Sequence, residues 1–309
     1  ATCKGYVIKS FLNSSGSSTT IISKLNDLKG VWIESGIILF SINGIKTSID
    51  FTGGTVINFN VKKDSYDPEF NLRSYLKENL DQNVSLVEMN SKDGLHRVVI
   101  TTQFLKDEGL VNTVLKKKYG DGYVIEKIES IGPKIGKELK NNSLKAIVVA
   151  MLLIGIYITF RFDSYYALGS IIALFHDIAI TLSFLIFFQY EISISIIAAL
   201  LTILGYSLND TIVIYDRIRE NMNLNIEEKD RNIVANNSLN STLNRTVITS
   251  LTTLIVAGVL FVLGGQVLQP FAMALIIGVL TGTYSSLFIA TPLMLILEKK
   301  YKLKDFEEE

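Results

Sequence analysis

The second half of the chain alternates between long apolar runs and short polar connections. A helix needs roughly 20 apolar residues to cross a bilayer core of ~30 Å, and five runs approach or exceed that length. Soluble helices average only ~10–14 residues, so five such runs in succession are not typical of a soluble core. The pattern predicts a helical membrane domain over residues 144–297, with a tail at 298–309. The expected spans are 144–160, 165–188, 192–215, 240–263 and 271–297.

Residues 50–140 have a different pattern, with no long apolar run and with charges of both signs. Short stretches typical of strands are separated by two stretches with helical spacing. Their order, β-α-β-β-α-β, predicts an α+β domain with a ferredoxin-like fold. The expected elements are a strand at 49–61, a helix at 68–80, strands at 84–89 and 95–102 around the turn at Asp93-Gly94, a helix at 105–119 and a strand at 123–131.

The first fifty residues carry a weaker pattern. Residues 37–45 are apolar, but charged residues such as Glu34 precede them. We expect an atypical first transmembrane span at 31–48 and assign no element to 1–30. Lys4 and Lys9 are not followed by an apolar segment, so no signal peptide is predicted. The expected fold is an all-α polytopic membrane bundle of five or six helices with one inserted α+β domain.

Composition narrows the function classes. The 30 basic and 30 acidic residues give zero net charge, which argues against nucleic acid as a partner because phosphate binding needs a basic surplus. The single cysteine, Cys3, excludes a disulfide framework and a thiolate metal cluster. With only two histidines, a zinc site built from histidine is not expected. The sequence also has no phosphate-binding loop and no nucleophile elbow, so we expect a transport protein rather than an enzyme, with no cofactor.

Basic residues in short loops predict the orientation, because Lys and Arg collect on the cytoplasmic side. The connections at 189–191 and 264–270 contain neither residue, so they are expected outside. The domain at 50–140 then also lies outside, since long domains translocate whatever their charge. The basic residues that mark the cytoplasmic ends are Arg161, Arg217, Arg219, Lys229, Arg231, Arg245, Lys299, Lys300, Lys302 and Lys304.

Three charged positions within the apolar runs are candidate functional residues. An ionisable group at the bilayer centre costs ~3 kcal/mol or more, so each needs a partner, a water-filled cavity or a function. These residues are Asp177, Asp210 and Arg245. Helical spacing places Asp210 on a polar stripe with Thr202, Tyr206 and Asn209, and Arg245 on a second stripe with Thr242, Thr246, Thr249, Thr252 and Thr253. We expect Arg245 to hold Asp210 ionised until a proton releases it.

Each of these interpretations has a plainer alternative. Asp210 and Arg245 could form a static pair that serves packing, or Arg245 could extend to the interface. Asp177, next to His176, could serve only a helix contact. Four small residues at four-residue spacing predict close helix packing rather than a ligand path. They are Ala274, Gly278, Gly282 and Ser286.

Several blocks of the sequence resemble the SecD/SecF family of protein-export membrane proteins, and within it the SecF branch, in the resistance-nodulation-division superfamily. The blocks are IDFTGGT at 49–55, IGP at 131–133 with Gly136, ALFHD at 173–177, GYSLNDTIVIYDRIREN at 205–221, RT at 245–246 and TSLTT at 249–253. The block at 205–221, together with those at 245–246 and 249–253, is highly specific for this family. Two departures are Ser48, where the family has Gly, and Tyr215, where Phe is usual; we expect the second to be harmless.

The resemblance implies a multi-pass protein of the bacterial inner membrane, with a periplasmic domain after the first helix. It implies pairing with SecD and use of the proton gradient to help complete preprotein translocation through SecYEG, begun by SecA. The family's proton-pathway residues carry over to Asp210 and Arg245, and Asp177 also matches a family motif. Tyr206, Asn209 and Thr249 are the expected supporting polar residues.

The connections between the two domains are expected to transmit movement, because glycine permits unusual backbone angles and proline fixes one. They could equally be plain turns. The junction residues are Asp50, Gly53, Gly54, Gly132, Pro133 and Gly136. Two other functions remain open at this point: one half of a proton-coupled exporter of small molecules or lipids, and a non-conducting scaffold of the translocase.

Overall fold

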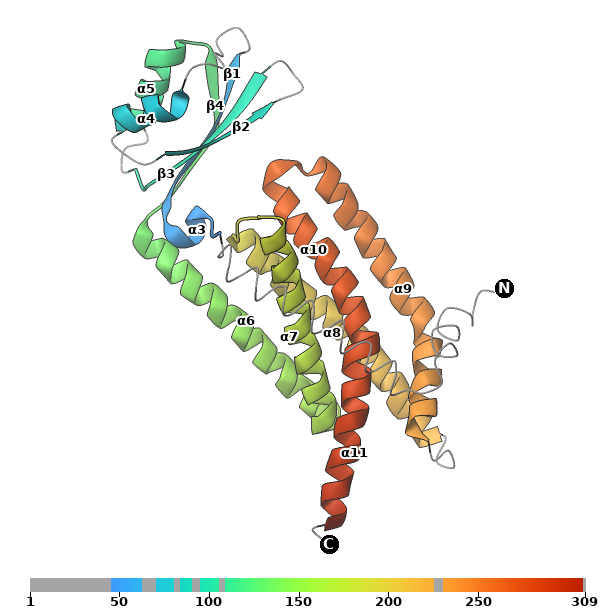
Figure 1. Cartoon of the computed structure of the whole chain (residues 1–309). Coiled ribbons are helices and arrows are strands. Elements are labelled where there is room, and N and C mark those ends of the chain that lie inside the picture. Colours follow the sequence, from blue (N-terminus) through green and yellow to red (C-terminus); the bar gives the residue numbers. More distant parts are fainter. Residues whose placement is uncertain are drawn as a thin grey trace. The chain divides into compact units, whose positions relative to one another are not determined.

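The computed structural model describes residues 46–62, 71–80, 84–90, 95–105, 109–224 and 230–307. These residues belong to two compact units, one formed by Thr47–Leu144 and the other by the remaining chain. Figure 1 shows their helices and strands. The predicted first span at 31–48 lies outside the described residues except for its last three positions, and residues 1–30 lie wholly outside them.

The Thr47–Leu144 unit contains an antiparallel four-stranded sheet in the order β2-β3-β1-β4. The β-α-β-β-α-β order expected from the sequence is the observed order. In register, Ile57 of the central strand faces Ile100 on one side and Ile128 on the other. The elements are α3 (Ile49–Thr52), β1 (Gly54–Lys62), α4 (Leu72–Leu80), β2 (Val84–Asn90), β3 (Leu95–Thr102), α5 (Gly109–Tyr119) and β4 (Tyr123–Ile131).

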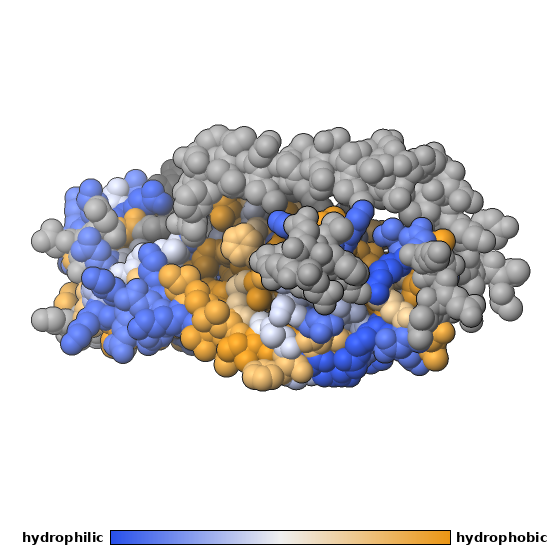
Figure 2. Space-filling model, turned by 90° about the horizontal axis from the view of Figure 1, so that it is seen from below, coloured by the Kyte–Doolittle hydropathy of each residue, from blue (hydrophilic) through white to orange (hydrophobic). Residues whose placement is uncertain are grey.

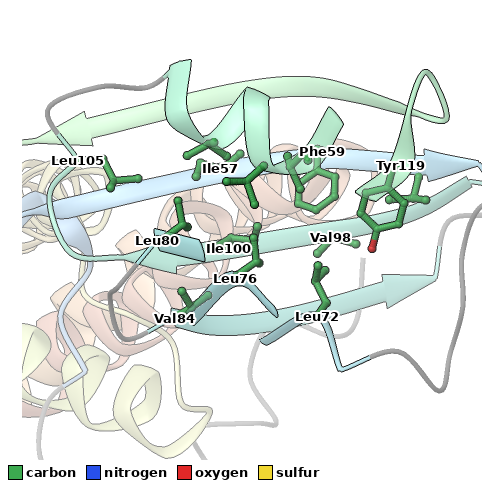
Figure 3. Packing of buried hydrophobic residues seen from close by; sticks show 14 residues of the cluster. Ile57, Phe59, Leu72, Leu76, Leu80, Val84, Val98, Ile100, Leu105 and Tyr119 are labelled. Atoms are coloured by element: carbon green, nitrogen blue, oxygen red, sulfur yellow. The ribbon is translucent and has the colours of Figure 1, made fainter. Parts of the chain in front are cut away.

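The core of this unit lies between one face of the sheet and the helices α4 and α5 (Figure 3). Alternate residues of the strands point into it, as the two-residue period of a strand requires. Leu72, Leu76 and Leu80 of α4 enter it at four-residue spacing, which places them on one face of that helix. Residues 57–61 and 98–100 supply the strand side, where Ile57, Phe59, Val98 and Ile100 are fully buried.

Two sequence expectations for this unit are wrong in detail. Residues 49–52 were expected in a strand but form the single helical turn α3. The turn forms because the Ser48 hydroxyl accepts a hydrogen bond from the backbone N–H of Asp50 at 3.2 Å, which caps the helix. The helix expected from 105 begins at Gly109, since Leu105 is buried in the core while its N–H donates to the Thr55 hydroxyl at 3.1 Å.

The junction glycines bring the start and the end of this unit into backbone contact. Gly53 ends α3 with a φ of 73°, and a Cβ there would lie 2.7 Å from the Pro133 Cα. A Cβ on Gly136, in the first turn of α6 (Pro133–Arg161), would lie 2.9 Å from the Gly53 nitrogen. By contrast, a Cβ on Gly132 would meet nothing within 4 Å. Gly53 and Gly136 are therefore required by close approach, whereas Gly132 is not.

The second unit is a bundle of long helices. Among the described residues, five helical stretches are long and apolar enough to cross a membrane, which agrees with the number expected over residues 144–297. They are α6 (Pro133–Arg161), α7 (Ser164–Phe187), α8 (Ile194–Leu224), α9 (Arg231–Leu263) and the continuous stretch formed by α10 (Gly265–Ser285), the π-helical turn η2 (Ser286–Ala290) and α11 (Thr291–Glu307).

The helices extend beyond the apolar runs from which they were predicted. α6 begins at Pro133 rather than at 144, and α9 begins at Arg231 rather than at 240. Apolar residues mark the part of a helix that lies in lipid, while its polar turns continue with the same backbone hydrogen bonds. The fifth run was predicted as one helix, but its regular turns are interrupted at Ser286–Ala290.

Burial divides the bundle into a packed centre and two outer helices. In the most apolar 18-residue stretch of each helix, about half of the residues are buried in α7 (50%), in α8 (44%) and in the α10–α11 stretch (56%). The corresponding share is 11% in α6 and 17% in α9. α10 packs against α7, α8 and α9. Apolar side chains exposed on the surface are visible in orange beside hydrophilic residues in blue (Figure 2). An apolar helix face can remain exposed in this way where lipid surrounds it.

Small residues allow α10 to approach α8 closely, as their spacing predicted. A Cβ on Gly278 would lie 2.1 Å from Cδ1 of Ile203, and one on Gly282 would lie 3.0 Å from Cβ of Ser207. Ala274 and Ser286 on the same face are fully buried. Packing is the principal attraction between helices in lipid, so this face fixes the contact between α8 and α10.

We expect Gly136→Ala to lower the stability of the Thr47–Leu144 unit by about 1–3 kcal/mol, because the new methyl group overlaps the backbone of Gly53. Gly132→Ala is the matched control and should cost less than about 1 kcal/mol. Amide hydrogen exchange of β1 and β4 in the intact protein would report the difference. Equal exchange in the two variants would contradict the close approach.

Gly278→Ala should lower the thermal midpoint of the detergent-solubilised protein, because Ile203 must move to admit the methyl group. An overpacking cost of about 1–3 kcal/mol is expected. In Gly258→Ala, where nothing lies within 4 Å, the midpoint should not fall. A midpoint for Gly278→Ala equal to that of the native chain would show that this contact does not form.

Candidate functional site

A buried carboxylate joins three helices at the centre of the bundle. Asp177 of α7 is fully buried, and its Oδ2 accepts hydrogen bonds from the hydroxyl of Ser207 on α8 at 2.7 Å and of Ser285 on α10 at 2.8 Å. Its Oδ1 lies 3.3 Å from Nδ1 of His176. These hydrogen bonds connect α7, α8 and α10 through one side chain.

Further hydroxyl groups extend this connection along the helices. The hydroxyl groups of Thr211 and Ser286 lie 3.0 Å apart, and Ser286 also donates to the carbonyl of Ser207 at 3.3 Å. We call the whole group the serine cluster; its members are Asp177, Ser207, Thr211, Ser285 and Ser286. All five are buried, and the cluster ties α8 to α7 and α10 at two successive levels.

The π-helical turn supplies a third level of contact. A π turn leaves backbone carbonyls without their usual partners, and here the carbonyl of Ala290 accepts a hydrogen bond from the hydroxyl of Tyr215 at 3.1 Å. Gly169 of α7 makes room for this contact, since a Cβ there would lie 3.0 Å from the Tyr215 oxygen. The hydroxyl that distinguishes this tyrosine from the usual phenylalanine is therefore bonded inside the bundle.

Asp210 has an environment opposite to that of Asp177. It lies on α8 one turn after Ser207 and is only 3% exposed, yet its Oδ2 has no hydrogen-bond partner among the described residues. The same holds for the buried hydroxyl oxygens of Tyr206 and Thr246. Buried polar atoms are nearly always bonded, so these three atoms mark an incomplete polar site in the bundle.

Contacts at the far end of α8 set its register against α9. Nε of Arg217 donates to the Ser241 hydroxyl at 3.2 Å, and the Asn221 amide donates to the Ser238 hydroxyl at 2.8 Å. The two helices run in opposite directions with the same rise of ~1.5 Å per residue. Asp210, seven residues before Arg217, therefore lies at the depth of residues 245–249, where Thr246 is buried.

The expected pairing of Asp210 with Arg245 is not formed among the residues that the structure describes. Arg245 is exposed, and it makes no ion pair with Asp210, although its charge acts electrostatically on that carboxylate. Of the expected supporting residues, Asn209 is exposed, and the Thr249 hydroxyl donates within its own helix to the Arg245 carbonyl at 3.1 Å. Tyr206 alone shares the buried face of Asp210, at i, i+4.

The structure thus separates the predicted residues into three groups. Asp177 belongs to the serine cluster, and Asp210 with Tyr206 forms the incomplete polar site. The junction residues lie in the other unit, where Asp50 donates its N–H to Ser48. Sequence reasoning missed Ser207, Thr211 and Ser285. The i, i+4 spacing of Ser207 and Thr211 within the longest motif could have identified them as one buried polar face. No sequence pattern pointed to Ser285.

Comparisons with known proteins agree with this architecture. Residues 111–300 match the family described as protein export membrane protein SecD/SecF, C-terminal. The protein translocase subunit SecF of Calditerrivibrio nitroreducens is 36% identical over 89% of this chain and 91% of its own length. The corresponding subunit of Sebaldella termitidis is 40% identical over 84% of this chain and 85% of its own length.

Two crystal structures of SecDF have a similar fold. The structure of SecDF from Thermus thermophilus, titled a translocon-associated membrane protein, shares 34% identity and a TM-score of 0.77 over 90% of this chain. A super-membrane-facing form shares 33% identity and a TM-score of 0.66 over 92%. The chain spans 38–39% of the length of those SecDF chains. Because the family description matches residues 111–300 and the two SecF relatives align over most of the chain, the chain belongs to the SecD/SecF family of protein export membrane proteins.

Proposed function

We propose that this multi-pass membrane protein uses the proton motive force to assist preprotein translocation, and that Asp210 is the residue that takes up the proton. The observation that carries the proposal is the buried Oδ2 of Asp210, which has no hydrogen-bond partner among the described residues; the same is true of the hydroxyl of Tyr206, one turn earlier on α8. A buried carboxylate must be paired or protonated, because an isolated charge in a medium of low dielectric is costly. Asp210 therefore has two favourable states, neutral or paired.

Arg245 is the residue that would stabilise the ionised state. Its charge already acts on Asp210, and it stands next to Thr246, the buried residue of α9 at the same depth. In our proposal the guanidinium pairs with Asp210 when the carboxyl is ionised, and a proton from outside releases it. A charge that crosses ~100 mV supplies ~2.3 kcal/mol, enough to change a two-state equilibrium by a factor of tens.

The outer helices are the elements that such a switch would move. α7, α8 and α10 are held together by the serine cluster and by close packing, whereas the apolar stretch of α9 is only 17% buried, although α9 also packs against α8 and α10. α6 is equally exposed in its apolar part, and it runs without a break from the junction at Pro133 to Arg161. A displacement of the bundle would reach the α+β domain through this helix and through the contact of Gly136 with Gly53.

The α+β domain is the proposed site of contact with emerging preprotein. Its ferredoxin-like order of elements leaves one sheet face without helices among the described residues, while α4 and α5 cover the other. The uncovered face carries polar groups; Arg97 and Asn60 both bind Glu126 across the sheet. Since basic residues mark the opposite ends of the spans, we place this domain on the periplasmic side of the inner membrane.

A SecD chain is the proposed partner in the membrane. The similar SecDF chains are more than twice as long as this one, so a second half accompanies the matching part there. Asn209 and Arg245 are exposed within predicted spans, where contact with lipid would be costly. A partner that covers these residues would remove that cost. SecYEG, SecA and an unfolded preprotein complete the proposed assembly.

Asp210→Asn should abolish the gradient-dependent part of export by vesicles that contain the assembled complex. Asparagine has nearly the same shape but cannot take up and release a proton. Export is measured with and without a proton gradient at matched protein levels. Glu220→Gln is the control, because Glu220 lies on the same helix in an exposed ion pair with Arg217. Full gradient-dependent stimulation in Asp210→Asn would refute the proposal.

Arg245→Leu should likewise remove the gradient-dependent part while the complex still assembles, and Arg245→Lys should retain part of it because the charge remains. Lys300→Ala, an exposed lysine on α11, serves as the control. This test also examines the alternative of a non-conducting scaffold. The absence of an ion pair between Asp210 and Arg245 among the described residues is the observation that favours that alternative. Native activity in Arg245→Leu would favour the scaffold.

A further inference from the structure

We propose that Asp177 is a positioning residue for the proton step, and that it holds α8 in place without carrying the proton itself. The inference rests on the proposed function of Asp210. The two carboxylates share a bundle but differ in their bonds: Oδ2 of Asp177 accepts two hydrogen bonds, while Oδ2 of Asp210 has no partner among the described residues. Two acidic groups in opposite environments are suited to different tasks.

The bonds of Asp177 suit it to hold helices together rather than to move them. The residue is fully buried, and Oδ2 receives one hydroxyl from α8 and another from α10. A proton on Oδ1 would leave both of these hydrogen bonds in place, so it would not release α8. Asp210 can take up a proton without breaking any hydrogen bond at Oδ2.

The links of the serine cluster lie on both sides of Asp210 along α8. Ser207, three residues before it, donates to Asp177, and Thr211, immediately after it, meets the Ser286 hydroxyl at 3.0 Å. Residues three and four apart share one face of a helix, so these two links fix the rotation of α8. With that rotation fixed, Asp210 stays at the edge of the face that packs on α10 and remains directed to the incomplete polar site.

The backbone around the cluster is adapted to this contact. Gly282 stands where a Cβ would lie 3.0 Å from Cβ of Ser207 and 3.6 Å from Oδ2 of Asp177, so a larger residue would push the helices apart. The π turn begins at Ser286, directly after Ser285. Such turns redirect side chains within otherwise regular helices, and here both serines reach the cluster.

An asparagine at position 177 separates positioning from proton transfer. In Asp177→Asn the side-chain oxygen can accept from Ser207 and Ser285, and the amide can donate to Nδ1 of His176, so all three contacts are retained. Asparagine carries no exchangeable acidic proton. We therefore expect Asp177→Asn to keep at least about half of the gradient-dependent export, whereas Asp210→Asn loses it.

Removing the hydroxyl partners should have the opposite effect. The double variant Ser207→Ala with Ser285→Ala loses both links, and we expect gradient-dependent export to fall about fivefold or more. Ser183→Ala is the control, because among the described residues that α7 hydroxyl bonds only to the Ala179 carbonyl of its own helix. Export without a gradient is measured alongside, since a general loss of structure would lower it as well.

The inference is overturned if Asp177→Asn loses as much as Asp210→Asn, or if the double serine variant exports at the native level with a gradient. Where Asp177→Asn does not accumulate in the membrane, the serine variants decide alone. Native activity in Asp210→Asn would instead refute the proposed function.

Discussion

Every polar group inside the bundle depends on a partner from another helix or from its own backbone, because lipid offers none. Most of the described hydroxyl groups in the spans meet this requirement within one helix, as Thr181 does with the carbonyl of Asp177. The serine cluster meets it between helices instead. Its hydrogen bonds and the small residues beside them account for the burial of α7, α8 and the α10–α11 stretch, and they define the part of the bundle against which other parts can move.

The few groups that do not meet this requirement lie on one side of that centre. Asp210, Tyr206 and Thr246 each bury an oxygen that has no partner among the described residues, and Arg245, whose charge acts on Asp210, is exposed. The membrane unit therefore combines satisfied polar contacts among α7, α8 and α10 with unsatisfied polar atoms on α8 and α9. The apolar stretch of α9 is 17% buried, although the helix packs against both α8 and α10.

How much of this could be predicted from the sequence differs from element to element. The apolar runs predicted the five long helical stretches of the described residues, and β3 (Leu95–Thr102) and β4 (Tyr123–Ile131) follow from alternation. The helical turn at Ile49–Thr52 was predicted as part of a strand, because the apolar pattern does not show that the Ser48 hydroxyl caps a helix at this position. Asp177 and Asp210 were recognised as intramembrane charges, but periodicity alone could not show that one is bonded and the other is not. The partners of Asp177 come from residues 30 and 108 positions away, which local spacing cannot connect.

The central claim is that the proton on Asp210 controls the position of α9 against the three-helix centre. Spin labels at Val256 of α9 and Phe175 of α7, both well exposed, would measure that distance in the reconstituted complex. We expect two distance populations whose ratio changes with pH in the native chain, and a single population at every pH in Asp210→Asn. A pH-dependent ratio that persists in Asp210→Asn, or one population in the native chain at every pH, would contradict it.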